Sequence, residues 1–163
     1  MADLSDARYK LYSSPFSLYS MMARHTIHLG PTTANAKPPK EITLGFIHHK
    51  GGENLKEEYL RFVNPKGQVP SMTGNVLKET LTDSISITLY LAENHYPAML
   101  PAEHAAEIRD LLTRLHAVYG LSISNKNPTP EMTVRNPSPV EKILQRTDLS
   151  PEYRKALEFK LQL

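Results

Sequence analysis

The chain has 163 residues, of which 40% are hydrophobic and 22% are charged, the composition of an ordinary globular protein that can bury a core. Its 19 basic and 17 acidic side chains give a net charge of +2 and are spread along the sequence, so neither nucleic acid nor a membrane surface is an expected partner. Because the chain has no cysteine, disulfides, cysteine-ligated zinc sites and thiol nucleophiles of its own are excluded.

The first part of the chain alternates strand and helix patterns. Residues 8–13 alternate polar and apolar side chains, which predicts a strand, and residues 18–29 repeat apolar side chains at helical spacing. Gly30 ends this helix, and a proline-rich loop follows it. Residues 41–47 predict a second strand and residues 53–63 a second helix, so the order to this point is β-α-β-α.

A hairpin and a third helix complete the pattern. Short strands are predicted at residues 71–73 and 76–79, around a glycine-asparagine turn, and an amphipathic helix at residues 81–93. The order β-α-β-α-β-β-α predicts an α/β domain with a mixed sheet, which we assign to residues 1–94.

The remaining residues, 95–163, predict a short all-α domain. Residues 94–101 are expected to form a linker. Pro101 suits the first turn of a long helix, whose apolar positions recur at helical spacing over residues 102–119.

The end of the chain combines an irregular segment with two short helices. Residues 124–139 are rich in proline and asparagine and predict a long excursion. The helices are predicted at residues 140–146 and 151–161, the second with Ser150 as its N-cap and Pro151 at its first position.

Pro70 stands where a strand is about to begin. Proline has no N–H for a sheet ladder, and the peptide bond that precedes it can be cis, so a Val-Pro step at this point requires a reason. The surrounding sequence, N-P-K-G-Q-V-P at residues 64–70, is one of three motifs that supply one.

The other two motifs are S-P-F-S-L-Y-S-M-M-A-R at residues 14–24 and T-D-S-I-S-I-T-L-Y-L at residues 82–91. Together and in this order, the three resemble the active-site turn, the N-P-x-G-x-V-P segment and the E-S-x-A-I-x-x-Y-L segment of the glutathione S-transferases. This resemblance implies a thioredoxin-like N-terminal domain and a helical C-terminal domain, which is shortened here. Residues 100–117 and 147–161 also resemble fungal members associated with secondary metabolism.

The resemblance implies that glutathione is the co-substrate and that it docks beside Pro70. A cis bond before Pro70 would turn the backbone of Val69 outward, so that it pairs antiparallel with the extended tripeptide. Asp83 and Ser84, at the start of a helix, are expected to hold the γ-glutamyl group, and Gln68 is expected to reach the same region.

The ligand of the glycyl carboxylate is expected in the segment that follows the second strand. Lys56 is the favoured candidate by resemblance. His49, Lys50 and Asn54 are further candidates in the same segment.

Ser17 is the candidate catalytic residue, since it stands where serine-type members of the family place the hydroxyl that donates to the glutathione sulfur. A free thiol with a pKa of about 8.5 is only about 3% ionised at neutral pH, so such a donor favours the thiolate. A plain helix N-cap is the alternative role, and Tyr12 and Tyr19 are alternative hydroxyls. Thioredoxin-type redox enzymes would carry cysteine at Ser17 and Ser20, so that chemistry is excluded.

The expected function is addition of the glutathione thiolate to an electrophilic small molecule. A conjugating transferase keeps the adduct. A glutathione-dependent cis/trans isomerase releases the thiolate again after rotation of an activated olefin, and both outcomes stay open. The alternative from another class is a non-catalytic glutathione-fold module that binds or regulates.

The oligomeric state and the cellular compartment are also expected from the sequence. The family resemblance implies a homodimer, and the lack of a targeting or membrane-spanning segment favours the cytoplasm. The histidine pairs at residues 25 and 28 and at residues 48 and 49 lack a third convergent ligand, so no metal site is expected.

Overall fold

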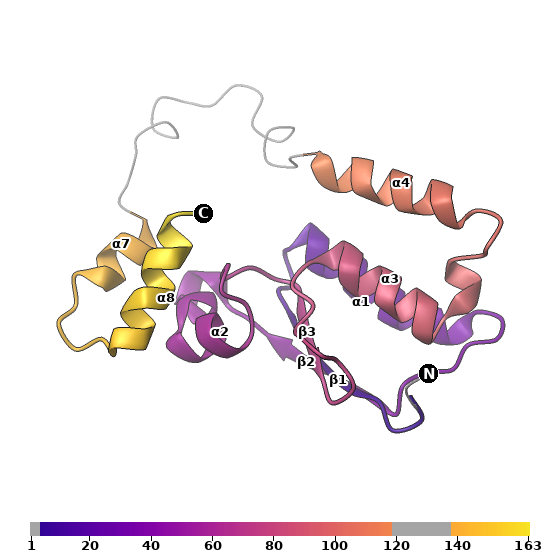
Figure 1. Cartoon of the computed structure of the whole chain (residues 1–163), viewed down its shortest axis with the longest axis horizontal. Helices are drawn as coiled ribbons and strands as arrows, with labels where there is room; N and C mark the ends of the chain where they lie inside the picture. Colours follow the sequence, from indigo (N-terminus) through magenta and orange to yellow (C-terminus); the bar gives the residue numbers. More distant parts are fainter. Residues whose placement is uncertain (1–3, 119–137) are drawn as a thin grey trace.

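The computed structural model of the chain describes residues 4–118 and 138–163 (Figure 1). Three strands form one small sheet, namely β1 (Arg8–Ser13), β2 (Glu41–Phe46) and β3 (Ser71–Gly74). The described helices are α1 (Leu18–Leu29), α2 (Glu57–Phe62), α3 (Ser84–Asn94), α4 (Ala105–Ala117), α7 (Pro139–Leu144) and α8 (Pro151–Leu161). The predicted α/β organisation followed by helices is confirmed.

The sheet has the order β2-β1-β3, with β1 parallel to β2 and antiparallel to β3. Leu11 at the centre of β1 lies opposite Leu44 of β2 and Met72 of β3. Leu11 and Met72 are fully buried together with Ala23 of α1 and Ile87 of α3. The two helices therefore cover one face of the sheet and form the main core with it.

The predicted second strand of the hairpin, at residues 76–79, is wrong. After β3 the chain turns and returns through a single antiparallel bridge, in which Met72 and Leu81 exchange backbone hydrogen bonds of 2.7 and 3.0 Å. Val76 and Leu77 are adjacent and both pack against the main core. Successive side chains of a strand point to opposite faces, so this packing excludes a strand there.

The predicted start of the fourth helix is also wrong. Pro101 precedes α4 rather than opening it: its carbonyl accepts a hydrogen bond from the N–H of His104 in a turn, and the helix begins at Ala105. An ion pair between Arg109 and Glu93 joins α4 to α3, which lies beside it (Figure 1). The predicted excursion at residues 124–139 falls, up to residue 137, outside the described residues.

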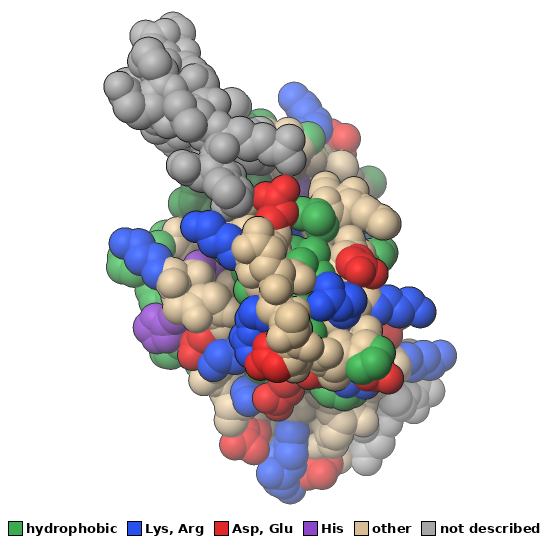
Figure 2. Space-filling model, turned by 90° about the vertical axis from the view of Figure 1, so that its left-hand side faces the viewer, with side chains coloured by type: hydrophobic (Ala, Val, Ile, Leu, Met, Phe, Trp, Pro, Cys, Tyr) green, Lys and Arg blue, Asp and Glu red, His purple; other side chains and the backbone are tan. Residues whose placement is uncertain are grey.

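Helix α8 packs on α2 and α7 packs on α8, both away from α4 (Figure 1). Leu55 and Leu60 from the α2 region, with Val140 of α7 and Leu157 of α8, form a second buried cluster. On the surface at this end of the molecule, basic and acidic side chains are interspersed (Figure 2). None of the helices in the described parts of the chain is long and apolar enough to cross a membrane.

Both of these helices begin with a serine cap. Ser150 accepts a hydrogen bond from the N–H of Tyr153 at 3.0 Å, and Pro151 occupies the first helical position, so the predicted cap is confirmed. Ser138 caps α7 in a capping box.

The segment between α3 and α4 is anchored to the main core by Tyr96, which is 1% exposed. Its ring lies against Gly30 at the end of α1, where an added Cβ would meet the Cδ2 atom of Tyr96 at 2.2 Å. Glycine at this position is therefore what allows the ring to pack on α1.

The neighbouring His95 is also buried and belongs to a polar chain. Its Nδ1 lies 2.9 Å from the carbonyl of Lys37, its Nε2 lies 2.9 Å from the hydroxyl of Tyr9, and that hydroxyl lies 3.0 Å from the hydroxyl of Tyr90. A carbonyl can only accept, so Nδ1 carries the hydrogen and Nε2 accepts from Tyr9. Burial lowers the pKa of His95, opposed by its hydrogen bond to Lys37.

We predict a pH-dependent stability that originates at His95. Because its pKa is lower in the folded protein than in the unfolded chain, its contribution is fully present above the usual histidine pKa of about 6.5 and is lost as the pH falls below it. Urea unfolding at pH 7.5 and pH 5.5 (both about one unit from that pKa) should show a loss of unfolding free energy in the wild type that is smaller in His95→Gln.

The matched control is His25→Gln, because His25 is exposed. The loss of unfolding free energy between pH 7.5 and pH 5.5 should stay at the wild-type value in His25→Gln. If this loss is the same in His95→Gln as in the wild type, or if it shrinks equally in both variants, the buried imidazole is not its source.

Candidate functional site

The N-P-K-G-Q-V-P loop is organised by the side chain of Asn64, which is fully buried. Its Nδ2 lies 3.0 Å from the carbonyl of Gln68, 3.0 Å from Ser71 Oγ and 3.5 Å from the carbonyl of Thr82. Its Oδ1 accepts from the N–H of Lys66 at 2.9 Å. One side chain thus joins the loop, the first residue of β3 and the residue that precedes the N-cap of α3.

Tyr59 of α2 supports the same loop from the other side. Its hydroxyl donates to the carbonyl of Gln68 at 2.7 Å, and its ring packs edge-on against Tyr12 with the centroids 5.7 Å apart. Burial raises the pKa of Tyr59 to about 12, so the hydroxyl remains a donor. Gly67 has a φ of 58°, and an added Cβ there would lie 3.0 Å from the carbonyl oxygen of Asn54.

Val69 presents an unpaired backbone at the end of this loop. The Val69–Pro70 peptide bond is cis, as predicted, and the Val69 side chain is buried with Tyr59 and Val63. Within the described residues, neither the N–H nor the C=O of Val69 has a hydrogen-bond partner. This donor and this acceptor can therefore pair with the main chain of an extended peptide. The side chain of Gln68 is exposed next to it.

Ser17 is the N-cap of α1, where its Oγ accepts from the N–H of Ser20 at 3.2 Å. Because the oxygen accepts this bond, the hydroxyl hydrogen is left to donate elsewhere. Two further bonds of 3.2 Å fix the surrounding turn: Ser20 Oγ accepts from the N–H of Ser14, and Arg24 donates to the carbonyl of Pro15. Ser17 is partly exposed.

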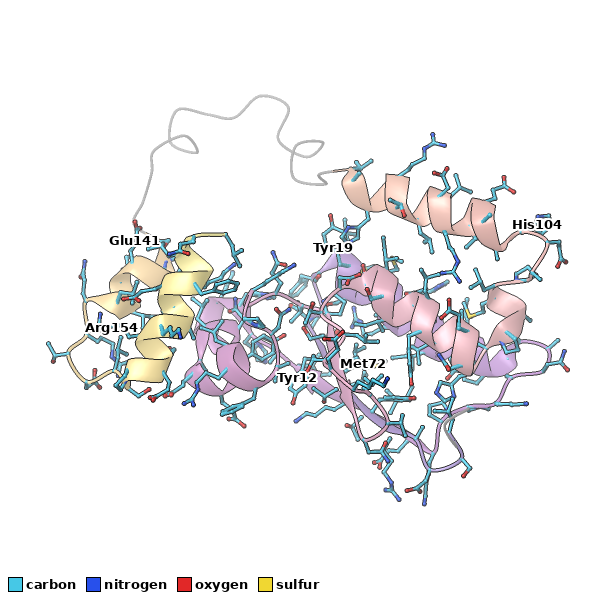
Figure 3. All side chains as sticks on the ribbon, in the orientation of Figure 1. Tyr12, Tyr19, Met72, His104, Glu141 and Arg154 are labelled. Atoms are coloured by element: carbon cyan, nitrogen blue, oxygen red, sulfur yellow. The ribbon has the colours of Figure 1, made fainter. Side chains whose placement is uncertain are left out.

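The strand register brings the turn of Ser17 and the backbone of Val69 to the same end of the sheet, where β1 ends and β3 begins. Tyr12 near the end of β1 lies opposite Ser71 at the start of β3. The turn follows β1 directly, and Val69 precedes β3 by two residues. The two alternative tyrosines lie near this turn: the ring of Tyr12 packs against Tyr59 of α2, and the ring of Tyr19 lies 4.9 Å from the ring of His116 of α4 (Figure 3).

Asp83 and Ser84 open α3. Asp83 is its N-cap and accepts from the N–H of Ser86 at 2.8 Å and from its hydroxyl at 2.6 Å, so Asp83 has a capping role. Asp83 and Arg61 of α2 both line a hollow of about 500 Å³. Ser84 is fully buried, and its Oγ has no hydrogen-bond partner among the described residues.

Lys56 and the candidates near it lie on exposed turns between β2 and α2. The Lys56 side chain is 66% exposed and lies 3.8 Å from the carboxylate of Glu53. A hydrogen bond from the N–H of His48 lowers the pKa of Glu53, helped by the charge of Lys56. His49 and Lys50 are exposed. No cluster of three potential metal ligands occurs in residues 4–118 and 138–163.

Asn54, in the same segment, differs from Lys56 because its side chain is engaged. Its Nδ2 donates to the carbonyl of Gly67 at 2.9 Å. The segment with Lys56 is thereby attached to the loop that carries Val69, although the ammonium group itself extends into solvent.

The fold resembles several solved structures. A glutathione transferase homologue from Sulfitobacter, crystallised with bound glutathione, matches with a TM-score of 0.58 and 19% identity over 95% of this chain and 66% of that one. A diazinon-metabolizing glutathione S-transferase of the silkworm Bombyx mori matches with a TM-score of 0.58 and 16% identity, over 94% of this chain and 64% of that one. A delta-class glutathione transferase of Nilaparvata lugens matches with a TM-score of 0.55 and 20% identity, over 94% of this chain and 63% of that one.

The chain has the glutathione transferase fold. The predicted thioredoxin-like domain followed by a helical domain is therefore confirmed. The chain spans slightly less than two thirds of the length of these transferases. No family model and no curated protein matches the sequence.

Two residues that organise the candidate site, Asn64 and Tyr59, have no role predicted from the sequence. Asn64 belongs to a motif, and an asparagine before proline in a tight loop is a recognisable signal for a side chain that bonds nearby backbone. Tyr59 lies in a predicted helix, and no local pattern signals its bond to Gln68, because that bond depends on how α2 packs.

We predict that Asn64→Ala lowers the free energy of unfolding by about 2–3 kcal/mol, because several buried polar groups lose a partner at once. Asn94→Ala is the matched control, since the one bond that half-buried Asn94 donates within residues 4–118 and 138–163 goes to the carbonyl of Tyr90 in its own helix. This variant should lose about 1 kcal/mol or less. Urea denaturation measures both. Equal losses would contradict the organising role of Asn64.

Proposed function

We propose that the protein binds glutathione along the backbone of Val69 and delivers its thiolate to an electrophilic small molecule. The observation that carries this proposal is the unpaired N–H and C=O of Val69, at the same end of the sheet as the turn of Ser17. An extended peptide that pairs with this N–H and C=O gains two main-chain hydrogen bonds and a fixed direction.

The γ-glutamyl end of the peptide has a binding place at the start of α3. Helix N-termini attract carboxylates through their free N–H groups, and the buried hydroxyl of Ser84 lacks any partner within the described residues. The Asp83 carboxylate caps the helix through Ser86 and keeps lone pairs for an ammonium group. In the proposed complex, the exposed side chain of Gln68 would contact the peptide between the start of α3 and Val69.

The glycyl carboxylate would meet Lys56, whose ammonium group is exposed and only weakly paired with Glu53. The connection from Asn54 to Gly67 holds this segment next to the loop. The peptide would therefore lie from the start of α3 toward the start of α2.

Ser17 would act on the sulfur. Its oxygen already accepts from Ser20, so its hydrogen is directed away from the helix and can donate to a thiolate. A hydrogen bond to the charged form lowers the thiol pKa. The sulfur lone pair then forms a bond to the electrophilic carbon. A leaving group departs with its electron pair, or an olefin carbon takes a proton.

The same arrangement serves conjugation and isomerisation. In an isomerisation the carbanion formed by thiolate addition rotates about the new single bond and expels the thiolate, so no glutathione is consumed. The quantity of glutathione used per product therefore separates the two. A protein that binds glutathione but turns over no electrophile would instead be a binding module.

We further propose a homodimer that works in the cytoplasm, where glutathione is kept reduced. Phe62 is 66% exposed beside the hollow that Asp83 borders, and an exposed aromatic ring of this kind is suited to a protein contact. Light scattering after gel filtration measures the mass, and a monomer would remove the dimer from this proposal.

We predict that Ser17→Ala lowers kcat/KM with an activated electrophile about ten- to a hundredfold, the effect of one lost hydrogen bond to a charged group. Ser138→Ala is the matched control, because Ser138 is also a helix N-cap but lies on α7. It should lose a similar stability, about 1 kcal/mol, and keep its activity. If both variants lose activity equally, Ser17 is only a cap.

A further inference from the structure

The α2 helix lies between two buried clusters. On one side Tyr59 and Val63 pack with Val69, the residue whose backbone is unpaired. On the other side Leu60 packs with residues of α7 and α8, which cover this side of the helix (Figure 1). A displacement of α8 would therefore change the packing of α2 and, through α2, that of the Val69 loop.

The turn before α2 depends on the C-terminal helices for its burial. Leu55 is 6% exposed, and apart from Leu60 its cluster consists of side chains from residues 140–157. The preceding residues form short turns around Gly52, which has a positive φ of 67°. Without α7 and α8 this turn would have few apolar contacts of its own.

Two hydrogen bonds join α8 to this turn. The hydroxyl of Tyr153 donates to the carbonyl of Leu55 at 2.7 Å, and the hydroxyl of Ser150 donates to the carboxylate of Glu57 at 2.7 Å. The bond from Ser150, with that from Arg61, lowers the pKa of Glu57. The two anchors therefore lie on either side of Lys56.

The anchored turn is connected to the loop of Val69 on its other side. Asn54, directly before Leu55, donates to the carbonyl of Gly67. The chain of contacts thus leads from Tyr153 to Leu55, and from Asn54 to the loop. Residues 98 positions apart in the sequence are joined at this point.

We propose that Tyr153 is a positioning residue for the glycyl end of bound glutathione. This inference rests on the proposed function and extends it to a helix that does not touch the peptide. By holding the Leu55 carbonyl, the hydroxyl fixes the backbone between Asn54 and Lys56 before the ligand arrives. Binding then does not have to order this turn, which is how preorganisation increases affinity.

The test uses Tyr153→Phe, which removes only the hydroxyl. Calorimetric titrations with glutathione and with γ-glutamylcysteine, which lacks the glycine, separate the glycyl end from the rest of the site. In the variant, the Kd for glutathione should rise about three- to tenfold, the worth of one hydrogen bond, while the Kd for γ-glutamylcysteine stays the same. In a Lys56→Ala background the same change should have little further effect.

Tyr90→Phe is the matched control. It removes one part-buried tyrosine hydroxyl that bonds Tyr9 in the main core, and it should change neither Kd. A wild-type protein that binds neither peptide overturns the proposed function itself, before any variant is made. If the wild type binds glutathione and Tyr153→Phe weakens both peptides equally, or neither, only the positioning role is overturned.

Discussion

The buried amide of Asn64 bonds to three separate parts of the chain, and the candidate site depends on it. Its hydrogen bonds connect the loop before Pro70, the first residue of β3 and the approach to α3. If the amide were removed, its buried partners would lose hydrogen bonds that nothing else replaces. The cost in unfolding free energy would exceed the net value of one hydrogen bond. The main-chain edge at Val69 and the start of α3 are therefore fixed relative to each other.

The position of α2 extends this constraint to the far end of the chain. Tyr59 holds the loop from the sheet side, while α8 contacts the opposite side of the same helix through Tyr153. The turn of Ser17 depends instead on β1 and on its own cap. The sulfur end and the glycyl end of the proposed peptide site thus have different supports, one local and one supplied by the C-terminal helices.

Local patterns predicted much of this architecture. The strand at residues 8–13, the helix at 18–29 and the cap at Ser150 follow from periodicity and from single-residue preferences, which act over a few neighbours. The prediction of a strand at residues 76–79 was wrong because the adjacent side chains of Val76 and Leu77 both pack against the main core, which β-propensity does not reveal. Asn64 lies in a loop motif that signals its bonds to nearby backbone but not those to β3 and to the approach to α3. The roles of Tyr59 and Tyr153 depend on tertiary contacts, for which the sequence contains no periodic signal.

The proposed function depends on a tripeptide that pairs with the backbone of Val69. The most direct measurement is an amide-resolved NMR titration of the ¹⁵N-labelled protein with millimolar glutathione. We predict that the N–H of Val69 and the first-turn N–H groups of α3 are among the most strongly shifted signals. Unchanged spectra, or shifts confined to regions remote from Val69 and the start of α3, would show that glutathione does not bind at this backbone.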